Sequence, residues 1–286
     1  MPVIDAHVHI FPDEIVQHRE RFVARDGWFA QLYSPERARL ATMYDLVESM
    51  NVAGIDLSVA CGFPWLDQGL CSYHNDYMYE AARTYPDRIA WLAIASPTAG
   101  EGASQSLEDA FDNGASGLGE LNADAQGFDL DAPAQLSGLV EVCQSRQKPV
   151  MLHASEPIGH HYPGKGVSTP DKLLRLLEAF PDLRVVAAHW GGGLPFYELM
   201  PEVRTAAINM AYDSAASTYL YDHRVFETVI ALVGHDRVLF ASDFPVLKQG
   251  PLLNKLRDRP GLSEFALTSI LGENAVRIYS LEEKFA

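Results

Sequence analysis

Two histidines near the start of the chain are the first residues whose spacing suggests chemistry. They stand in the run from Val3 to Ile10, whose apolar, β-branched character is typical of a strand. Alternate side chains of a strand share a face, so His7 and His9 point the same way, about 6 to 7 Å apart along the backbone. The pair therefore predicts two ligands for one metal ion, although an exposed pair without a metal is the alternative.

Four more side chains able to bind a metal stand where short apolar runs end. They are Glu120 in Gly117–Leu121, His153 in Val150–His153, His189 in Val185–His189 and Asp243 after Val238–Ser242. Either His153 or His189 alone could be an ordinary core histidine whose ring is hydrogen-bonded to the backbone. That explanation does not account for six side chains able to bind a metal, all at strand ends. Imidazoles and carboxylates suit a borderline divalent ion, and an open coordination position lowers the pKa of bound water towards neutrality.

Short β-branched runs alternate with longer amphipathic runs along the whole sequence. The expected strands are Val3–His9, Gly54–Cys61, Ile89–Ala95, Gly117–Leu121, Val150–His153, Val185–His189, Ala207–Tyr212 and Val238–Ser242. The expected helices are Pro35–Met50, His74–Tyr85, Ser104–Asn113, Ala132–Ser145, Pro170–Phe180, His223–Val233, Ser263–Leu271 and Glu273–Tyr279. Eight strands each followed by a helix favour a parallel (β/α)8 TIM barrel over a doubly wound open sheet.

The barrel prediction brings the six polar side chains together. Barrel enzymes build their sites at the carboxyl ends of the strands, which is where all six residues stand. No linker or change in composition divides the chain, so we expect one domain over residues 1–286.

Charge and composition narrow the partners that we expect. The 22 basic and 38 acidic residues give a formal charge of -16, which repels nucleic acid and anionic membranes and favours a small-molecule partner. Three cysteines, Cys61, Cys71 and Cys143, are too few for a disulfide framework. No segment approaches 18 uninterrupted apolar residues. These features predict a cytoplasmic protein.

The motifs resemble those of the amidohydrolase superfamily, and most closely its amidohydrolase-related branch with the aminocarboxymuconate-semialdehyde decarboxylase-like enzymes. The matching motifs are Asp5-Ala6-His7-Val8-His9, Leu152-His153-Ala154, Ala188-His189-Trp190-Gly191-Gly192 and Ser242-Asp243-Phe244-Pro245. The resemblance implies a barrel that holds a divalent metal, commonly zinc, on His7, His9, His153 and Asp243. It also implies that His189 polarises substrate and water or binds a second metal, and that the chain forms a homodimer.

Glu120 departs from the single-metal decarboxylases of that branch, which lack an acidic residue at this position. Its placement is similar to that of the bridging glutamate of binuclear relatives such as the TatD-like nucleases. One interpretation has Glu120 between an ion on His7, His9 and Asp243 and a second ion on His153 and His189. The other has Glu120 orienting a ligand histidine. One or two metals per chain are therefore both open.

The same ligands serve two reactions. In a hydrolase of a small carboxylic acid derivative, lactone or amide, hydroxide attacks the substrate, His189 or the metal stabilises the oxyanion, and Asp243 transfers the proton. In a nonoxidative decarboxylase, Asp243 or His189 protonates the carbon that loses carbon dioxide. Glu120 favours the hydrolase, and a noncatalytic relative of the same fold is the third possibility.

Loop residues supply the weaker expectations about substrate binding. Lys165 and His161, in the loop after the fifth strand, could meet a substrate carboxylate, or the loop could be ordinary surface. Trp28, in the segment 11–34, could belong to an apolar lid over the site or pack in the core. Tyr219 follows the seventh strand, and Trp190 directly follows His189, where it is expected to shape the pocket wall. The glycines 191–193 indicate close backbone approach rather than a phosphate loop.

Overall fold

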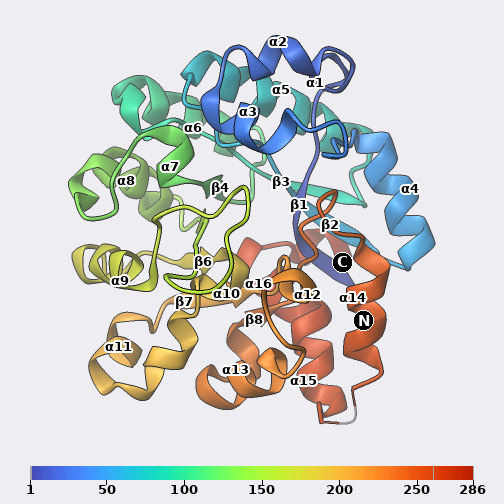
Figure 1. Ribbon diagram of the computed structural model, residues 1–286, viewed down its shortest axis with the longest axis vertical. Helices are drawn as coiled ribbons and strands as arrows, with labels where there is room; N and C mark the ends of the chain where they lie inside the picture. Colours follow the sequence, from blue (N-terminus) through green and yellow to red (C-terminus); the bar gives the residue numbers. More distant parts are fainter. Residues whose placement is uncertain (1, 260, 286) are drawn as a thin grey trace.

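The computed structural model describes residues 2–259 and 261–285 of the chain, and its strands alternate with helices throughout (Figure 1). The strands are β1 (Ile4–His9), β2 (Leu57–Cys61), β3 (Ile89–Leu92), β4 (Leu118–Leu121), β5 (Val150–Leu152), β6 (Val185–Ala187), β7 (Met210–Asp213) and β8 (Val238–Leu239). The helices are α1 (Asp13–Gln17), α2 (Arg19–Val23), α3 (Gly27–Tyr33), α4 (Met43–Ala53), α5 (Gln68–Thr84), α6 (Glu101–Asp112), α7 (Ala123–Gln126), α8 (Ser137–Ser145), α9 (Pro170–Ala179), α10 (Ala188–Gly191), α11 (Pro201–Ala206), α12 (Ser217–Leu220), α13 (Val225–Val233), α14 (Gln249–Arg257), α15 (Glu264–Thr268) and α16 (Asn274–Tyr279). A π-helical turn, Ser269–Glu273, joins the last two helices.

All strand pairs are parallel, in the order β1-β2-β3 and β4-β5-β6-β7-β8. Single bridges join the two sheets at both seams, Ala93 with Leu118 and Val8 with Phe244. The backbone amide of Ala6 also donates to the carbonyl of Phe240 at 2.9 Å, which ties β1 to the end of β8. The strands therefore form a ring, with the helices arranged around it in Figure 1. The predicted (β/α)8 barrel is confirmed.

Apolar side chains fill both sides of the ring. The interior holds small and medium residues, among them Ile4, Val59, Met151 and Val186, which form one buried cluster. A larger cluster lies between the strands and the surrounding helices. Both faces of each strand are thus covered, which explains why the strands read as continuous apolar runs rather than as alternating ones.

Several strands are shorter than predicted because side chains take over the hydrogen bonds of the ladder. β3 ends at Leu92 rather than Ala95, and the amide of Ile94 donates to the side chain of Asn75 at 2.8 Å. β8 ends at Leu239 rather than Ser242, and the amide of Ala241 donates to Ser214 Oγ at 2.9 Å. β7 is displaced instead, since it begins at Met210 rather than Ala207 and includes residue 213.

Several helical regions also differ from the prediction. α5 begins at Gln68 rather than His74, and α8 begins at Ser137 rather than Ala132. α4 begins at Met43 rather than Pro35 because Thr42 and Asp45 form a capping box, in which each side chain accepts the other's backbone amide. The segment expected as a lid folds into α1, α2 and α3. Phe29 and Tyr33 of α3 are buried against Phe11, with ring centroids 6.2 and 5.4 Å away. Core packing therefore accounts for much of this segment.

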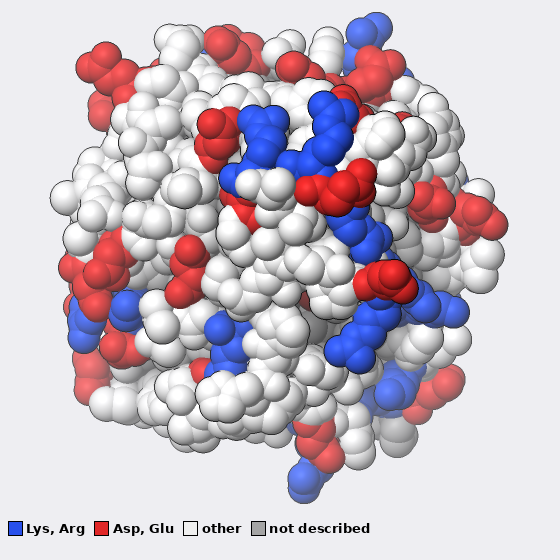
Figure 2. Space-filling model, turned by 45° about the horizontal axis from the view of Figure 1, so that its top comes forward, with Lys and Arg blue, Asp and Glu red and all other residues white. Residues whose placement is uncertain are grey.

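Within the part of the chain that the structure describes, no helix combines the length and the apolar character needed to cross a membrane. Figure 2 shows one face of the molecule, on which acidic side chains are scattered and the basic side chains lie among them. On this face the negative charge is spread over the surface rather than gathered in one patch.

Candidate metal centre

The six side chains predicted to bind metal lie together at the carboxyl ends of the strands. Their donor atoms fall into two groups, each with all atoms within 4.8 Å of one another. The first group comprises His7, His9 and Asp243, and the second comprises Glu120, His153 and His189. The barrel thus unites residues from β1, β4 and the ends of β5, β6 and β8, as expected from their positions.

The first group has the spacing of ligands around a divalent ion. Nε2 of His7 lies 3.0 Å from Nε2 of His9, and Oδ1 of Asp243 lies 3.6 Å from the latter atom. Donors bound about 2.1 Å from an ion lie roughly 3.0 to 3.5 Å from each other. Nδ1 of His9 is buried and has no hydrogen-bond partner among the described residues. The donor set and its spacing fit a divalent metal ion.

Glu120 lies between the two groups and contacts both. Its Oε2 atom is 3.6 Å from Nε2 of His7 and 3.6 Å from Nε2 of His9. Its Oε1 atom is 3.0 Å from Nδ1 of His153 and 3.3 Å from Nε2 of His189. One carboxylate therefore spans four imidazoles, an arrangement compatible with a bridging ligand and with a carboxylate that orients histidines.

Asp213, at the end of β7, completes the centre and was missed in the sequence. Its Oδ2 accepts a hydrogen bond from Nδ1 of His7 at 2.8 Å, which leaves Nε2 of His7 free to act as a ligand. Its Oδ1 accepts from the backbone amides of His189 at 2.9 Å and Ala215 at 3.0 Å. The available signal was its position directly after a predicted strand, the same signal that identified Asp243.

Burial and mutual charge shift the pKa values of these groups in different directions. Burial and the neighbouring His7 lower the pKa of His9 to about 3, so that this imidazole is neutral at pH 7. Burial raises the pKa of Asp243 to about 6. Burial disfavours ionised Glu120, but the charges of His7 and His153 and the hydrogen bonds with His153 and His189 outweigh it. Burial likewise disfavours protonated His189, but the hydrogen bond with Glu120 and the nearby carboxylates outweigh it. The pKa of Glu120 is accordingly held well below its usual range, while the hydrogen bond with Glu120 raises that of His189 to about 9.

The backbone turns sharply at two of the candidate ligands. His189 and Asp243 both have left-handed conformations, with φ of 56° and 66°. β6 therefore ends at Ala187, two residues before the predicted end at His189. A Cβ atom at Gly192 would collide with the carbonyl of Ser155, so the glycines after His189 do serve a close backbone approach.

The structure also locates the residues predicted to bind substrate after β5 and β7. Nζ of Lys165 donates to the carbonyls of Ile158 at 2.6 Å and His160 at 3.2 Å, so its charge supports its own loop. His161 is exposed in the same loop. Tyr219 is 52% exposed, and its ring lies 5.2 Å from that of His160, which joins the loops after β5 and β7. Their contact with substrate stays a prediction.

The two tryptophans lie in different surroundings. Trp28 in α3 is half-buried and packs against the main core. Trp190 is fully buried, its indole N–H donates to Ser217 Oγ at 2.7 Å, and its ring packs on Phe226 at 4.9 Å. These contacts are structural, and a role for either side chain in substrate binding also stays a prediction.

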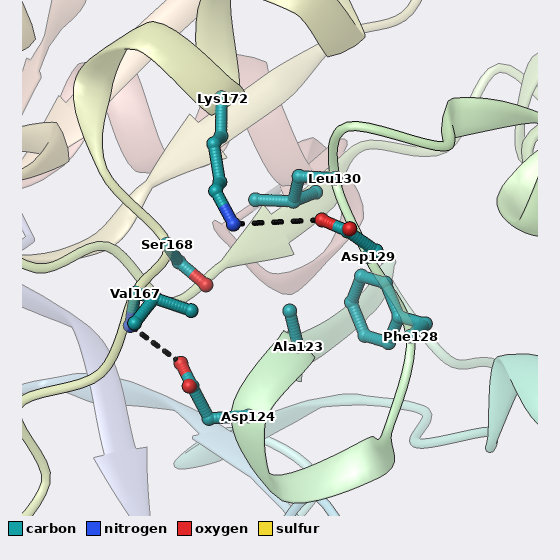
Figure 3. Close-up of a pocket in the computed structure, with 8 residues that line it drawn as sticks. All are labelled: Ala123, Asp124, Phe128, Asp129, Leu130, Val167, Ser168 and Lys172. Carbon is teal, nitrogen blue, oxygen red and sulfur yellow. Dashed lines mark hydrogen bonds and ion pairs between the residues drawn. The ribbon is translucent and has the colours of Figure 1, made fainter.

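A separate pocket of about 220 Å³ lies between α7 and the start of α9 (Figure 3). Its lining includes Ser168 and Lys172, whose Nζ atom lies 3.5 Å from Oδ1 of Asp129. None of the six candidate metal ligands lines it. The pocket is therefore distinct from the candidate metal centre.

A parallel barrel with imidazoles and carboxylates gathered at the carboxyl ends of its strands defines the class of metal-dependent barrel enzymes. The model of one family within this class, described as amidohydrolase, matches residues 4–281. The chain belongs to this amidohydrolase family, and the resemblance found in its motifs is confirmed.

Similar proteins extend the likeness over nearly the whole chain. The 2-amino-3-carboxymuconate-6-semialdehyde decarboxylase of Dictyostelium discoideum is 21% identical over 336 residues, covering 98% of this chain and 92% of the relative. The 5-carboxyvanillate decarboxylase LigW from Sphingomonas paucimobilis superimposes with a TM-score of 0.83 and 18% identity, covering 98% and 99% of the two chains. The 5-carboxyvanillate decarboxylase of Novosphingobium aromaticivorans superimposes with a TM-score of 0.81 and 19% identity, covering 98% of this chain and 96% of the other.

The last of these structures contains manganese and 4-hydroxy-3-methoxy-5-nitrobenzoic acid. In this chain itself, the two groups of donor atoms suit a divalent metal ion. The expectation of a small-molecule partner agrees with the small organic acid bound to this relative.

Proposed function

We propose that this protein is a metal-dependent nonoxidative decarboxylase of a small carboxylic acid that bears a neighbouring hydroxyl or carbonyl group. The observation that carries the proposal is the set of six metal-competent side chains in a chain that resembles decarboxylases over nearly its whole length. This proposal replaces the hydrolase favoured by the sequence motifs, since the similar proteins named above are decarboxylases.

We assign the metal, zinc or manganese, to His7, His9 and Asp243, with Oε2 of Glu120 beside both imidazoles. When bound, the ion supplies positive charge that attracts the substrate carboxylate and its neighbouring oxygen. Asp213 keeps the imidazole of His7 in the tautomer whose Nε2 faces the centre. His153 contacts the other oxygen of Glu120 and contributes to the same polar wall.

His189 is the proposed proton donor. Its Nδ1 atom lies 3.2 Å from the carbonyl of Ala215 and its Nε2 atom 3.3 Å from Glu120, so both ring nitrogens face acceptors. Such surroundings favour the imidazolium over the neutral ring. In the reaction the bond between carbon and carboxylate breaks, carbon dioxide leaves, and the carbon that keeps the electron pair takes a proton from His189. Asp243 is the second candidate for this donor.

A hydrolase that uses a metal-activated water is the second candidate function. It is favoured by Glu120, whose two oxygens face different ligand groups as those of a bridging carboxylate would. The number of ions per chain separates the two proposals, because a bridged pair of ions favours hydrolysis.

The direct test is to supply the protein, loaded with manganese or zinc, with 5-carboxyvanillate, 2,6-dihydroxybenzoate and 2-amino-3-carboxymuconate-6-semialdehyde. We expect carbon dioxide and the decarboxylated product in equal amounts from at least one acid. His7→Ala and Asp243→Asn should abolish turnover while the barrel stays folded by circular dichroism. Hydrolysis of a lactone or amide panel without carbon dioxide release would contradict the decarboxylase proposal. More than a few percent of activity in Asp243→Asn would contradict the role of Asp243.

A further inference from the structure

Asp5 stands two residues before His7 on β1, and no hydrogen bond among the described residues joins its carboxylate to a donor atom of the candidate metal centre. Its side chain is fully buried at the seam where β1 meets the residues that follow β8. Its Oδ1 accepts from the amide of Ser242 at 2.9 Å, and its Oδ2 accepts from Ser242 Oγ at 2.6 Å. Oδ2 also accepts from Nε2 of Gln249 in α14 at 2.9 Å. Among the residues that the structure describes, hydrogen bonds thus satisfy the carboxylate without a cationic partner.

These bonds connect both halves of the first ligand group. Asp5 precedes His7 by two residues on β1, and Ser242 precedes Asp243 directly. Two backbone hydrogen bonds also join the two sides of this seam. The amide of Asp243 donates to the carbonyl of His7 at 3.1 Å, and the amide of His9 donates to the carbonyl of Phe244 at 2.6 Å. The regular ladder of β8 has ended at Leu239, so the network continues the pairing past the end of the strand.

The network is anchored in the surrounding helices as well. Oε1 of Gln249 accepts from Ser49 Oγ in α4 at 2.8 Å, and its Nε2 lies 3.3 Å from Ser58 Oγ in β2. Ser242 Oγ, in turn, accepts from the amide of Phe244 at 3.0 Å. The carboxylate therefore fixes residues 242 to 244 against rigid elements on both sides. This constraint matters because Asp243 holds a left-handed backbone, which needs support from its surroundings.

We propose that Asp5 is a positioning residue, which fixes the distance between the His7 and His9 pair and Asp243 and thereby sets the affinity of the centre for its metal. The inference rests on the metal centre assigned under the proposed function. In Asp5→Asn, the amide nitrogen would replace one carboxylate oxygen that now accepts hydrogen bonds from Ser242 or Gln249. Two donors would then face each other, so we expect the loop that bears Asp243 to shift away from β1.

The test compares Asp5→Asn with Asp56→Asn, a control at an exposed aspartate. The side chain of Asp56 also accepts a hydrogen bond from the backbone, from the amide of Val3 at 2.7 Å. In the described part of the chain it has no hydrogen bond to residues 242 to 244. Metal-free protein is titrated with Mn²⁺, and free Mn²⁺ is followed by electron paramagnetic resonance. We expect Kd to rise about 10- to 100-fold in Asp5→Asn and less than about 2-fold in Asp56→Asn.

A spectroscopic measurement separates positioning from general destabilisation. The visible absorption bands of Co²⁺-loaded protein should shift in Asp5→Asn and stay unchanged in Asp56→Asn, even where both variants melt at a lower temperature. If Asp5→Asn does not fold, Ser242→Ala removes one donor of the network and should give a smaller change in the same direction.

Two results would overturn the inference in distinguishable ways. Wild-type Kd and Co²⁺ bands in Asp5→Asn, or in Ser242→Ala where that variant replaces it, would overturn the positioning role alone. Failure of the wild-type protein to bind Mn²⁺ or Co²⁺ would overturn the metal centre and the positioning role together.

Discussion

The orientation of His7 depends on one neighbour, since Asp213 occupies its Nδ1 atom and leaves Nε2 for the candidate metal centre. The partner comes from a strand 206 residues away, and no pattern in the sequence pairs the two. Sequence analysis therefore identified ligand types at strand ends but not the residue that orients one of them. The sequence singled out Lys165 for a substrate carboxylate but did not show the carbonyls that it contacts, because these depend on the path of its own loop.

Replacing Glu120 tests how many ions the centre holds. In the proposed decarboxylase, Glu120→Gln should leave about one ion per chain, as in the wild type, and weaken metal binding about 10- to 100-fold because an orienting charge is lost. Elemental analysis of protein purified without chelator measures the first quantity, and titration measures the second. A fall from two ions to one would instead establish a bridged pair and favour the hydrolase. Glu198→Gln, which changes a buried glutamate paired with Arg237, is the control.

His74 predicts a dependence of stability on pH that is separate from the metal centre. Its Nδ1 accepts from the indole of Trp65 at 3.0 Å and from the amide of Phe63, while its Nε2 donates to the carbonyl of Ile10 at 2.7 Å. Burial lowers the pKa of this ring from 6.5 to about 4. The unfolded chain therefore binds more protons between these values, and stability falls as the pH falls from 6.5 to 4.

The expected size of this effect is about 3 kcal/mol across that window. His74→Gln removes the titrating ring, so the free energy of unfolding of the variant should depend less steeply on pH between 6.5 and 4. Chemical denaturation at several pH values measures the slope. The exposed His18, changed to Gln, provides the control, which should keep the wild-type slope. Equal slopes in the wild type and His74→Gln would contradict the prediction.

At the scale of helices and strands, the hydrophobic pattern of the sequence predicted the existence of the elements better than the positions of their ends. All eight strands were expected, because burial on both faces leaves apolar runs that are easy to recognise. The positions where the strands end were not predicted. Side chains that are distant in the sequence, such as Asn75 and Ser214, accept hydrogen bonds from amides that would otherwise pair with a neighbouring strand. The helices α1 to α3 were also missed, because each is only five to seven residues long.

The start of α4 gives a test at this scale. Thr42→Ala removes the capping side chain that accepts from Asp45, and we expect it to lower the free energy of unfolding by about 1 kcal/mol. Denaturant titration measures the loss, and metal affinity should stay unchanged because neither residue is a candidate ligand. Ser263→Ala, at the cap of α15, should cost a similar amount. No measurable loss in Thr42→Ala would show that the capping box contributes little to the stability of the fold.

At the scale of the whole molecule, the metal should stabilise the fold as well as the site. Removing it with a chelator should lower Tm by several degrees, since a ligand at 100 times its Kd contributes about 2.7 kcal/mol. Restoring manganese should reverse the change in the wild type. In His7→Ala, added manganese should leave Tm unchanged. A Tm that does not respond to chelator or metal in the wild type would contradict the presence of a tight site.

The seam between β1 and the residues after β8 also has a consequence for synthesis on the ribosome. Asp5 and Ser242 are 237 residues apart in the chain, so the nascent protein exposes its first strand long before the partner of that strand has been made. His7 and His9 are made early, whereas Asp213 follows His7 only after 206 residues and Asp243 comes later still. The ring can therefore close, and the proposed ligand set become complete, only after β8 and Asp243 have been synthesised. A metal ion bound as proposed would accordingly find its full set of ligands only after residue 243 has been made.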